Sequence, residues 1–298
     1  MGNLFFYVMT ILIWGSTWLA IKYQLGVVAP AFSIAYRFAL AALILLVWCF
    51  VTKRPMRFSR RDHLFMALQG VMLFALNYLL FYLAELHITS GLAAVVFSTI
   101  VIMNLINGRI FLGTPVEWKV MIGGVFGLIG LGLLFWPEMV TVNFSGPIVS
   151  GLLFSFGATY LASLGNILSA RNQQKKLPII QSNAYGMSYG ALCMFLIAWL
   201  SGSPMMIETT PAYLFSLVYL SLFGSVIAFG CYLTLIGRIG VGRAAYTTLL
   251  FPIVALLLST IWEDYNWTIP GILGIGLILC GNYLALAKKK NLIRKEAV

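Results

Sequence analysis

The sequence predicts an all-α membrane protein in which ten transmembrane helices form two five-helix repeats of inverted topology. Three observations lead to this prediction: long apolar segments, basic residues confined to alternate loops, and a similarity between the two halves of the chain. Of the 298 residues, 61% are hydrophobic and only 9% are charged, whereas about 25% are charged in a typical globular protein. A water-soluble protein is therefore excluded.

Continuously apolar segments separate the clusters of charge along the whole chain. Each is close to the ~20 residues that a helix needs to cross a bilayer, whereas the strands of a membrane barrel alternate over ~10 residues. We therefore expect helices over residues 4–21, 31–51, 64–84, 88–108, 120–136, 146–170, 178–200, 213–236, 244–262 and 267–287.

The basic residues predict the side of the membrane on which each loop lies. With a cytoplasmic N-terminus, all of the 19 lysines and arginines except Lys22 and Arg37 fall in cytoplasmic segments. This bias predicts an even number of helices, with both termini in the cytoplasm. We expect the protein in the bacterial inner (plasma) membrane. No basic residue precedes Leu4, so we expect a permanent first helix and no cleaved signal peptide. Because the net charge of +11 resides in short loops, we expect the lipid bilayer as a partner and no nucleic acid.

The two halves of the chain resemble each other at a constant offset. The segment AYRFALAAL at 35–43 parallels AYGMSYGAL at 184–192, and SGLAAV at 90–95 parallels VGRAAY at 241–246. A shared register across separate helices indicates a repeat. With five helices each, the repeats enter the membrane in opposite directions, as in many secondary transporters. We expect them at residues 1–137 and 145–287, followed by a basic cytoplasmic tail at 288–298.

Three longer segments carry a family resemblance: IWGSTWLAIK at 13–22, FLGTPVEWKVMIGGVFGLIGLGLLF at 111–135 and IWEDYNWTIPGILGIGLILCGNYLAL at 261–286. With them, the chain resembles the paired EamA domains of the drug/metabolite transporter superfamily over nearly its whole length. The resemblance implies that small organic solutes move, often outward, through a cavity lined by the first, third, fourth, sixth, eighth and ninth helices. Residues that match the family pattern are Trp14, Gly15, Ser16, Trp18, Arg37, Phe38, Pro252 and Glu263, while Val101 and Thr114 depart from it in the first repeat.

Aromatic residues with polar tips recur at helical spacing in the cavity-lining helices. They suit a solute that is part apolar and part hydrogen-bonding, although core packing is an alternative for each of them. In the first helix they share one face with a threonine, and Tyr232 repeats Tyr82 in the second half. The candidates for substrate binding in this set are Trp14, Thr17, Trp18, Asn77, Tyr78, Tyr82 and Tyr232.

Arg37 is a charge within the second predicted helix. A charge at the centre of a membrane helix costs at least ~2.5 kcal/mol on insertion scales and usually has a partner or a function. Three interpretations stay open: an ion pair with an acidic group such as Glu85 for structure or gating, contact with the carboxylate of a bound solute, or snorkelling to the interface.

Other polar residues lie inside apolar helices, where they need internal partners. Packing accounts for most of them, and those on cavity-lining helices remain candidates for substrate binding: Ser98, Thr99, Tyr160, Asn166, Tyr246 and Thr247. Pro252 removes a backbone hydrogen bond from the ninth helix and predicts a kink or hinge.

Glycines at spacings near GxxxG predict close helix packing, within the chain or between subunits. They lie in the fifth and tenth helices, as Gly123 with Gly127 and as Gly274 with Gly281. GMSYG at 186–190 matches the G-x-S-x-G pattern of hydrolases, but it lies in an apolar helix rather than in the strand-turn-helix elbow that this chemistry requires. We therefore expect no enzyme.

The sequence predicts a secondary transporter without cofactor or metal. No P-loop is present, so uphill transport would use an ion gradient or exchange, with proton coupling left open. Amino acids moved outward by alternating access are the favoured substrates, because aromatic and hydroxyl groups with one arginine suit an apolar portion and a carboxylate. The alternatives are a multidrug-type exporter of lipophilic compounds and, in another class, a non-transporting receptor or assembly protein. The oligomeric state stays open.

Overall fold

The computed structural model describes residues 2–24, 26–140, 146–262 and 267–287, without the side chains of residues 18, 19, 22 and 262. Within these ranges all regular structure is helical, and no strand occurs. The predicted all-α class is confirmed. The basic tail at 288–298 and Glu263 lie outside the described residues.

The first half of the chain begins with α1 (Asn3–Lys22) and α2 (Pro30–Val51). Helix α2 starts on a proline, a residue that is over-represented at the first helical position. Ser59 then accepts a hydrogen bond from the Asp62 amide and caps the next helix. The remaining elements are α3 (Arg60–Val71), η1 (Met72–Leu76), α4 (Asn77–Glu85), α5 (Ser90–Ser98), α6 (Ile100–Leu112), α7 (Trp118–Leu134) and α8 (Trp136–Val140).

The second half repeats many of these features. Thr210 caps α11, again with a proline in the first turn, and Thr268 caps α15. The elements are α9 (Gly146–Gln174), α10 (Ile179–Leu200), α11 (Pro211–Tyr219), η2 (Leu220–Ile227), α12 (Ala228–Ile239), α13 (Val241–Ala244), α14 (Thr247–Trp262) and α15 (Ile269–Leu286).

Each predicted apolar segment coincides with one of these helices or with a consecutive run of them. In the part of the chain that the structure describes, eight helical runs are long and apolar enough to cross a membrane. Two further apolar helices, Asn3–Thr17 and Trp118–Leu134, are shorter. The protein is therefore a multi-pass membrane protein.

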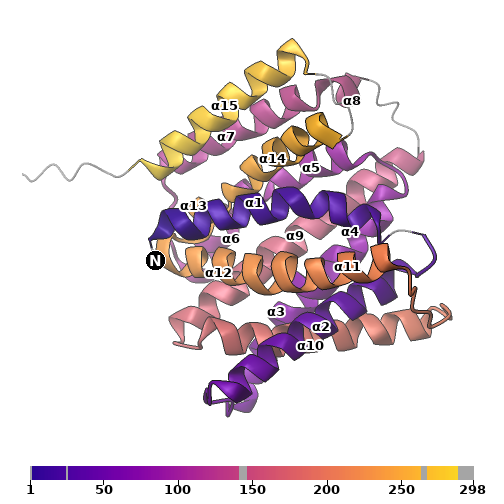
Figure 1. Ribbon diagram of the computed structural model, residues 1–298. Coiled ribbons are helices and arrows are strands. Elements are labelled where there is room, and N and C mark those ends of the chain that lie inside the picture. The colour runs from indigo at the N-terminus through magenta and orange to yellow at the C-terminus, as the bar shows by residue number, and fades with distance from the viewer. Residues whose placement is uncertain (1, 25, 141–145, 263–266, 288–298) are drawn as a thin grey trace, which may run out of the picture.

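Glycines join α7 to α15 along one edge of the bundle (Figure 1). A Cβ atom at Gly123 would lie 2.5 Å from the Gly281 carbonyl oxygen, and one at Gly130 would lie 2.6 Å from that of Gly274. No larger residue fits between two backbones at this distance. The predicted close packing of these glycines is thus found within the chain.

Two π-helical segments interrupt long helices at related positions in the two halves. Segment η1 lies between α3 and α4 in the first half, and η2 lies between α11 and α12 in the second. Within η2 the Ser225 hydroxyl donates to the Leu220 carbonyl at 3.0 Å, five residues back. Short π-helical stretches inside α-helices are frequent at functional sites, and both segments here lie beside the cavity described below.

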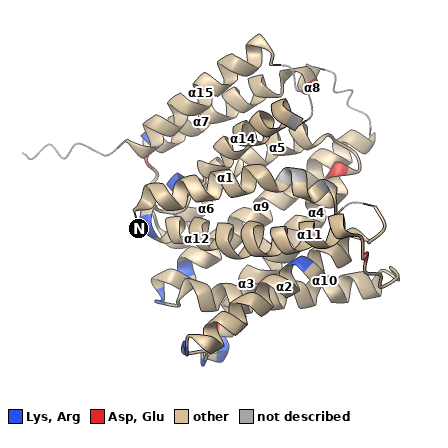
Figure 2. Cartoon of the chain, in the orientation of Figure 1, with Lys and Arg blue, Asp and Glu red and all other residues tan. Residues whose placement is uncertain are grey.

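The lysines and arginines gather at the end of the bundle where the N-terminus lies (Figure 2). This is the separation of charge that the sequence predicts for a multi-pass membrane protein. We call this end the basic end.

Candidate functional site

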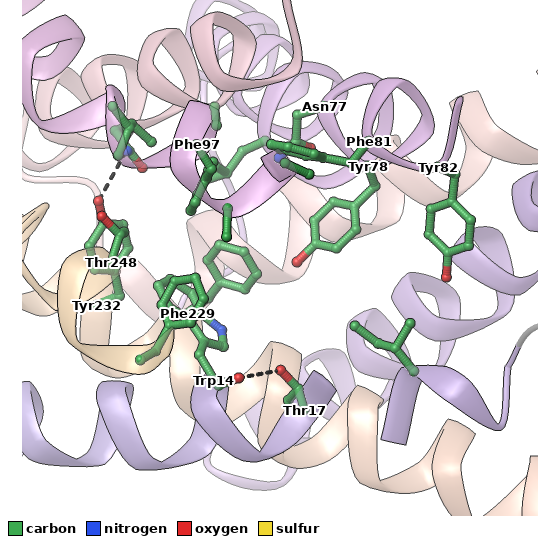
Figure 3. A pocket seen from close by; sticks show the side chains of 18 of the residues that line it. Trp14, Thr17, Asn77, Tyr78, Phe81, Tyr82, Phe97, Phe229, Tyr232 and Thr248 are labelled. Carbon is green, nitrogen blue, oxygen red and sulfur yellow. Dashed lines mark hydrogen bonds between the residues drawn. The ribbon is translucent and has the colours of Figure 1, made fainter. Parts of the chain in front are cut away.

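A cavity of about 150 Å³ lies in the middle of the bundle, between helices from both halves of the chain. Its walls come from α1, α2, η1, α4, α5, α6, α9, α12 and α14. Figure 3 shows Tyr78 and Tyr82 on one side, with Trp14 and Thr17 facing them across the open space. A volume of this size accommodates a small molecule, since an engineered protein cavity of about 150 Å³ binds benzene.

Most of the predicted site residues lie together around this cavity. They reach it from α1, α2 and α4 of the first half and from α9 and α12 of the second: Trp14, Thr17, Arg37, Asn77, Tyr78, Tyr82, Glu85, Asn166 and Tyr232. The side chain of Trp18 lies outside the described part of the chain.

Arg37 is buried in this wall, with only 6% of its surface exposed. Its Nε donates to the Ser225 hydroxyl at 2.9 Å, and its guanidinium carbon lies 5.2 Å from the centre of the Tyr78 ring. Among the described residues no ion pair joins Arg37 to Glu85, although both line the cavity. Of the three interpretations left open, the ion pair with Glu85 is thus not found among the described residues, and burial excludes snorkelling in this conformation. The described neighbours that hold the guanidinium are neutral and leave its charge uncompensated.

Trp14 connects α1 to the π-helical segment η2. Its indole Nε1 donates to the Gly224 carbonyl at 3.2 Å, and its ring contacts Phe229 and Tyr232 at centroid distances of 5.1 and 5.0 Å. Both Trp14 and Arg37 are thus anchored on consecutive residues of η2. The sequence gives no signal for this, because a π-helical segment has no recognised composition.

Two asparagines in the cavity wall have buried hydrogen-bond acceptors for which the described residues supply no donor. Asn166 donates through Nδ2 to the Tyr232 hydroxyl at 3.1 Å, but its Oδ1 is buried without a partner. The Oδ1 of Asn77 is also buried without a partner. Buried polar atoms are nearly always satisfied in folded proteins, so two unsatisfied acceptors in one cavity indicate that a ligand or water supplies the donors.

The other predicted site residues whose side chains the structure describes do not line the cavity. Ser98 and Thr99 each donate to a carbonyl three residues earlier, at the break between α5 and α6. Thr247 bonds in the same way to the Ala244 carbonyl. Their hydroxyls are used by the helices' own backbone, which explains why polar residues appear in these apolar segments.

Tyr160, Tyr246 and Pro252 are also placed elsewhere. Tyr160 is 42% exposed on the outer face of α9, whereas Tyr246 is fully buried and donates to the Val120 carbonyl of α7. Pro252 is buried inside α14, one turn after Thr248. A period-3.6 pattern does not distinguish an inward-facing tyrosine from these two positions.

The lining residues that sequence reasoning missed are mainly apolar, and the bulkiest of them are four phenylalanines: Phe81, Phe97, Phe229 and Phe251. Phenylalanines in a membrane helix resemble lipid-facing residues. Their spacing carried a usable signal, because Phe81 lies three residues after Tyr78 and Phe229 three before Tyr232, on shared helix faces. No spacing of this kind pointed to Ser225 as the partner of Arg37.

Comparison with known proteins gives a consistent result. A model of the EamA-like transporter family matches residues 1–136 and 149–287. Protein PagO of Salmonella typhimurium is 23% identical over 93% of each chain. The uncharacterized inner membrane transporter YedA of Escherichia coli K12 is 26% identical over 93% of this chain and 90% of that protein.

A solved crystal structure superposes on the fold with a TM-score of 0.80 at 17% identity, covering 95% of this chain and 96% of that one. This likeness concerns the fold alone. The family match covers both halves of the chain, so the protein belongs to the EamA-like transporter family and is a membrane transporter of the drug/metabolite transporter type, not an enzyme.

Proposed function

We propose that this protein is a secondary transporter that moves small amphipathic metabolites, with amino acids as the favoured class, outward across the inner membrane by alternating access. In this proposal ten transmembrane helices form two inverted five-helix repeats, residues 1–137 and 145–287, with both termini in the cytoplasm. The separate family matches to the two halves and the π-helical segment in each half support the repeat. The basic end supports the orientation.

The uncompensated Arg37 is the observation that carries the substrate class. A guanidinium presents two parallel N–H donors that match a carboxylate, and among the described residues Arg37 has a single hydrogen bond, from its Nε to the Ser225 hydroxyl. A buried charge without a counter-charge is costly in a membrane. A solute carboxylate would remove this cost, so we assign Arg37 to the carboxylate of the substrate.

The remaining groups suit the other parts of an amino acid. The unpaired Oδ1 atoms of Asn77 and Asn166 are acceptors for an ammonium group. The rings of Trp14, Tyr78 and Tyr82 offer apolar contact to a side chain. The cavity volume of about 150 Å³ favours a solute of the size of an amino acid over a large lipophilic compound.

A multidrug-type exporter of cations is the second candidate, because Glu85 lines the same cavity at the end of α4. A carboxylate there would attract a lipophilic cation, or carry a proton in antiport. In the amino-acid proposal Glu85 belongs to the gate.

A thermal-shift series on the purified protein separates these candidates, since a ligand stabilises the state to which it binds. Phenylalanine, phenylalaninamide and 3-phenylpropionate differ only in the carboxylate or the ammonium group, and a lipophilic cation represents the alternative. We expect stabilisation by phenylalanine above both analogues. Stabilisation by the lipophilic cation and phenylalaninamide, without phenylalanine, would instead support the multidrug exporter.

A further inference from the structure

A second hollow lies on the outside of the bundle, away from the transport cavity. It is a groove of about 1000 Å³ between α2, α10, η2 and α12, and its walls are almost entirely apolar. On α2 its wall includes Leu43, Val47 and Trp48, each of them more than half exposed. Because these residues face outward in a multi-pass membrane protein, the groove opens to the lipid.

The length of the groove matches one leaflet of the bilayer. It follows α2 from Leu43 to Val51 and ends at Arg54, just beyond the helix. At a helical rise of about 1.5 Å per residue, the stretch along α2 is roughly 12 Å long. The hydrocarbon of one leaflet is roughly 15 Å thick, half of the core of a typical bilayer. An acyl chain standing along the groove would therefore place its headgroup beside Arg54.

Arg54 is the single charged residue among the described groove-lining residues. No hydrogen bond or ion pair of its guanidinium is found among the described residues, and Lys53 and Arg57 lie in the same loop at the basic end. The end of the groove at Arg54, which we call its mouth, is thus positive and has no counter-charge among the described residues. A second copy of this chain, docked here by a twofold in the same membrane, would bring two such basic mouths together, which disfavours that occupant.

Gly230 widens the groove on the side of α12. A Cβ atom at this position would meet nothing within 4 Å, in contrast to the glycines between α7 and α15. The space beside Gly230 is therefore open rather than closed by packing.

From these observations we propose that the groove is a binding site for an anionic phospholipid, whose acyl chains lie against α2 and α12 and whose phosphate binds Arg54. Leu222, Val226 and Ile227 of η2 form part of its wall. Two other residues of η2, Gly224 and Ser225, hold Trp14 and Arg37 at the transport cavity. The lipid would thus contact the segment that positions the cavity.

Native mass spectrometry of the full-length protein tests this proposal with phosphatidylglycerol and phosphatidylcholine of identical acyl chains. We expect the wild type to retain phosphatidylglycerol preferentially. Arg54→Gln is expected to lower this preference about fivefold, the effect of one basic residue near an anionic surface. The matched control Arg57→Gln removes a charge from the same loop at a residue outside the groove wall, and it should retain the wild-type preference.

Gly230→Trp tests the groove itself by filling it, and should reduce retention of both lipids. Gly276→Trp is its control, because Gly276 also has open space around it and lies on α15. Equal effects of Arg54→Gln and Arg57→Gln would overturn the proposal in favour of diffuse attraction. Unchanged lipid retention in a folded Gly230→Trp variant would also overturn it. The same holds if the wild type is a dimer and Gly230→Trp abolishes the dimer, because the groove would then be a subunit interface. If Gly230→Trp does not fold, the comparison of Arg54→Gln with Arg57→Gln still tests the proposal.

Discussion

The α7–α15 contact and the central cavity use opposite kinds of residue to position helices. At the contact, glycines bring two backbones together so closely that no Cβ atom fits. Around the cavity, bulky aromatic rings hold α1, α4 and α12 apart and leave a hollow between them. A backbone contact has no rotamers and fixes its helices, whereas a wall of rings can repack as helices move. We infer that α7 and α15 form a fixed support against which the cavity-lining helices change position.

The largest effect is expected at the cavity, from Arg37→Gln. Removing one partner of a buried charge pair costs about 2–5 kcal/mol, which corresponds to at least thirty-fold weaker binding of a carboxylate-bearing solute. Isothermal titration of the purified variant with phenylalanine measures this. Arg37→Lys should recover part of the affinity, since it restores the charge without the two-pronged geometry. Unchanged affinity in Arg37→Gln would remove Arg37 from the site.

The next largest effect is expected from Gly130→Ala at the contact between α7 and α15. Its added methyl would lie 2.6 Å from the Gly274 carbonyl oxygen, and overpacking of this kind costs about 1–3 kcal/mol. The melting temperature in detergent should fall accordingly. Gly132→Ala is the matched control on the same helix, because its nearest neighbour, the Met139 sulfur, is 3.6 Å away. Equal melting temperatures for both variants would contradict the inference that α7 and α15 form a fixed support.

Asn77→Leu is expected to separate binding from stability. The variant removes a buried acceptor without a partner, so the melting temperature should hold or rise. Binding of a solute with an ammonium group should weaken about tenfold, since a hydrogen bond to a charged group contributes about 1.5 kcal/mol. Asn183→Leu should behave in the opposite way, because Asn183 accepts from Gln69 at 3.3 Å and lies outside the cavity. Lower stability with unchanged binding in Asn77→Leu would contradict the assignment.

The smallest effect is expected from Tyr246→Phe. It removes the hydrogen bond to the Val120 carbonyl, and such bonds in membrane proteins contribute about 0.6 kcal/mol on average. A slightly lower melting temperature with unchanged substrate affinity is the expected result. Tyr160→Phe, which alters an exposed hydroxyl, should change neither quantity. Weaker substrate binding in Tyr246→Phe would return this tyrosine to the cavity.

The difference between the two regions also explains what the sequence could predict. Helix bounds follow from local composition, so α10 at Ile179–Leu200 lies within a residue of the predicted 178–200. The glycine contacts were predictable because a missing side chain at helical spacing has few other uses. Arg37 stood out as well, since charge in an apolar helix is rare, but whether it is buried or snorkels to the interface stayed open.

The partners across the cavity could not be predicted. Ser225 meets Arg37 only after η2 and α2 are placed side by side, 188 residues apart in the chain. Tyr160 and Tyr246 show the same limit, because a tyrosine in an apolar helix can face lipid, a neighbouring helix or a cavity. Which of these applies depends on the rotation of each helix, and this is fixed by packing rather than by local sequence.

Counterflow of labelled phenylalanine in reconstituted vesicles tests the central claim most directly, namely that Arg37 in this cavity carries a solute carboxylate across the membrane. Wild-type protein and the control Arg109→Gln, whose arginine is exposed at the end of α6, should both exchange the label. Arg37→Gln should not, although it remains folded. Equal exchange by all three proteins would contradict the claim.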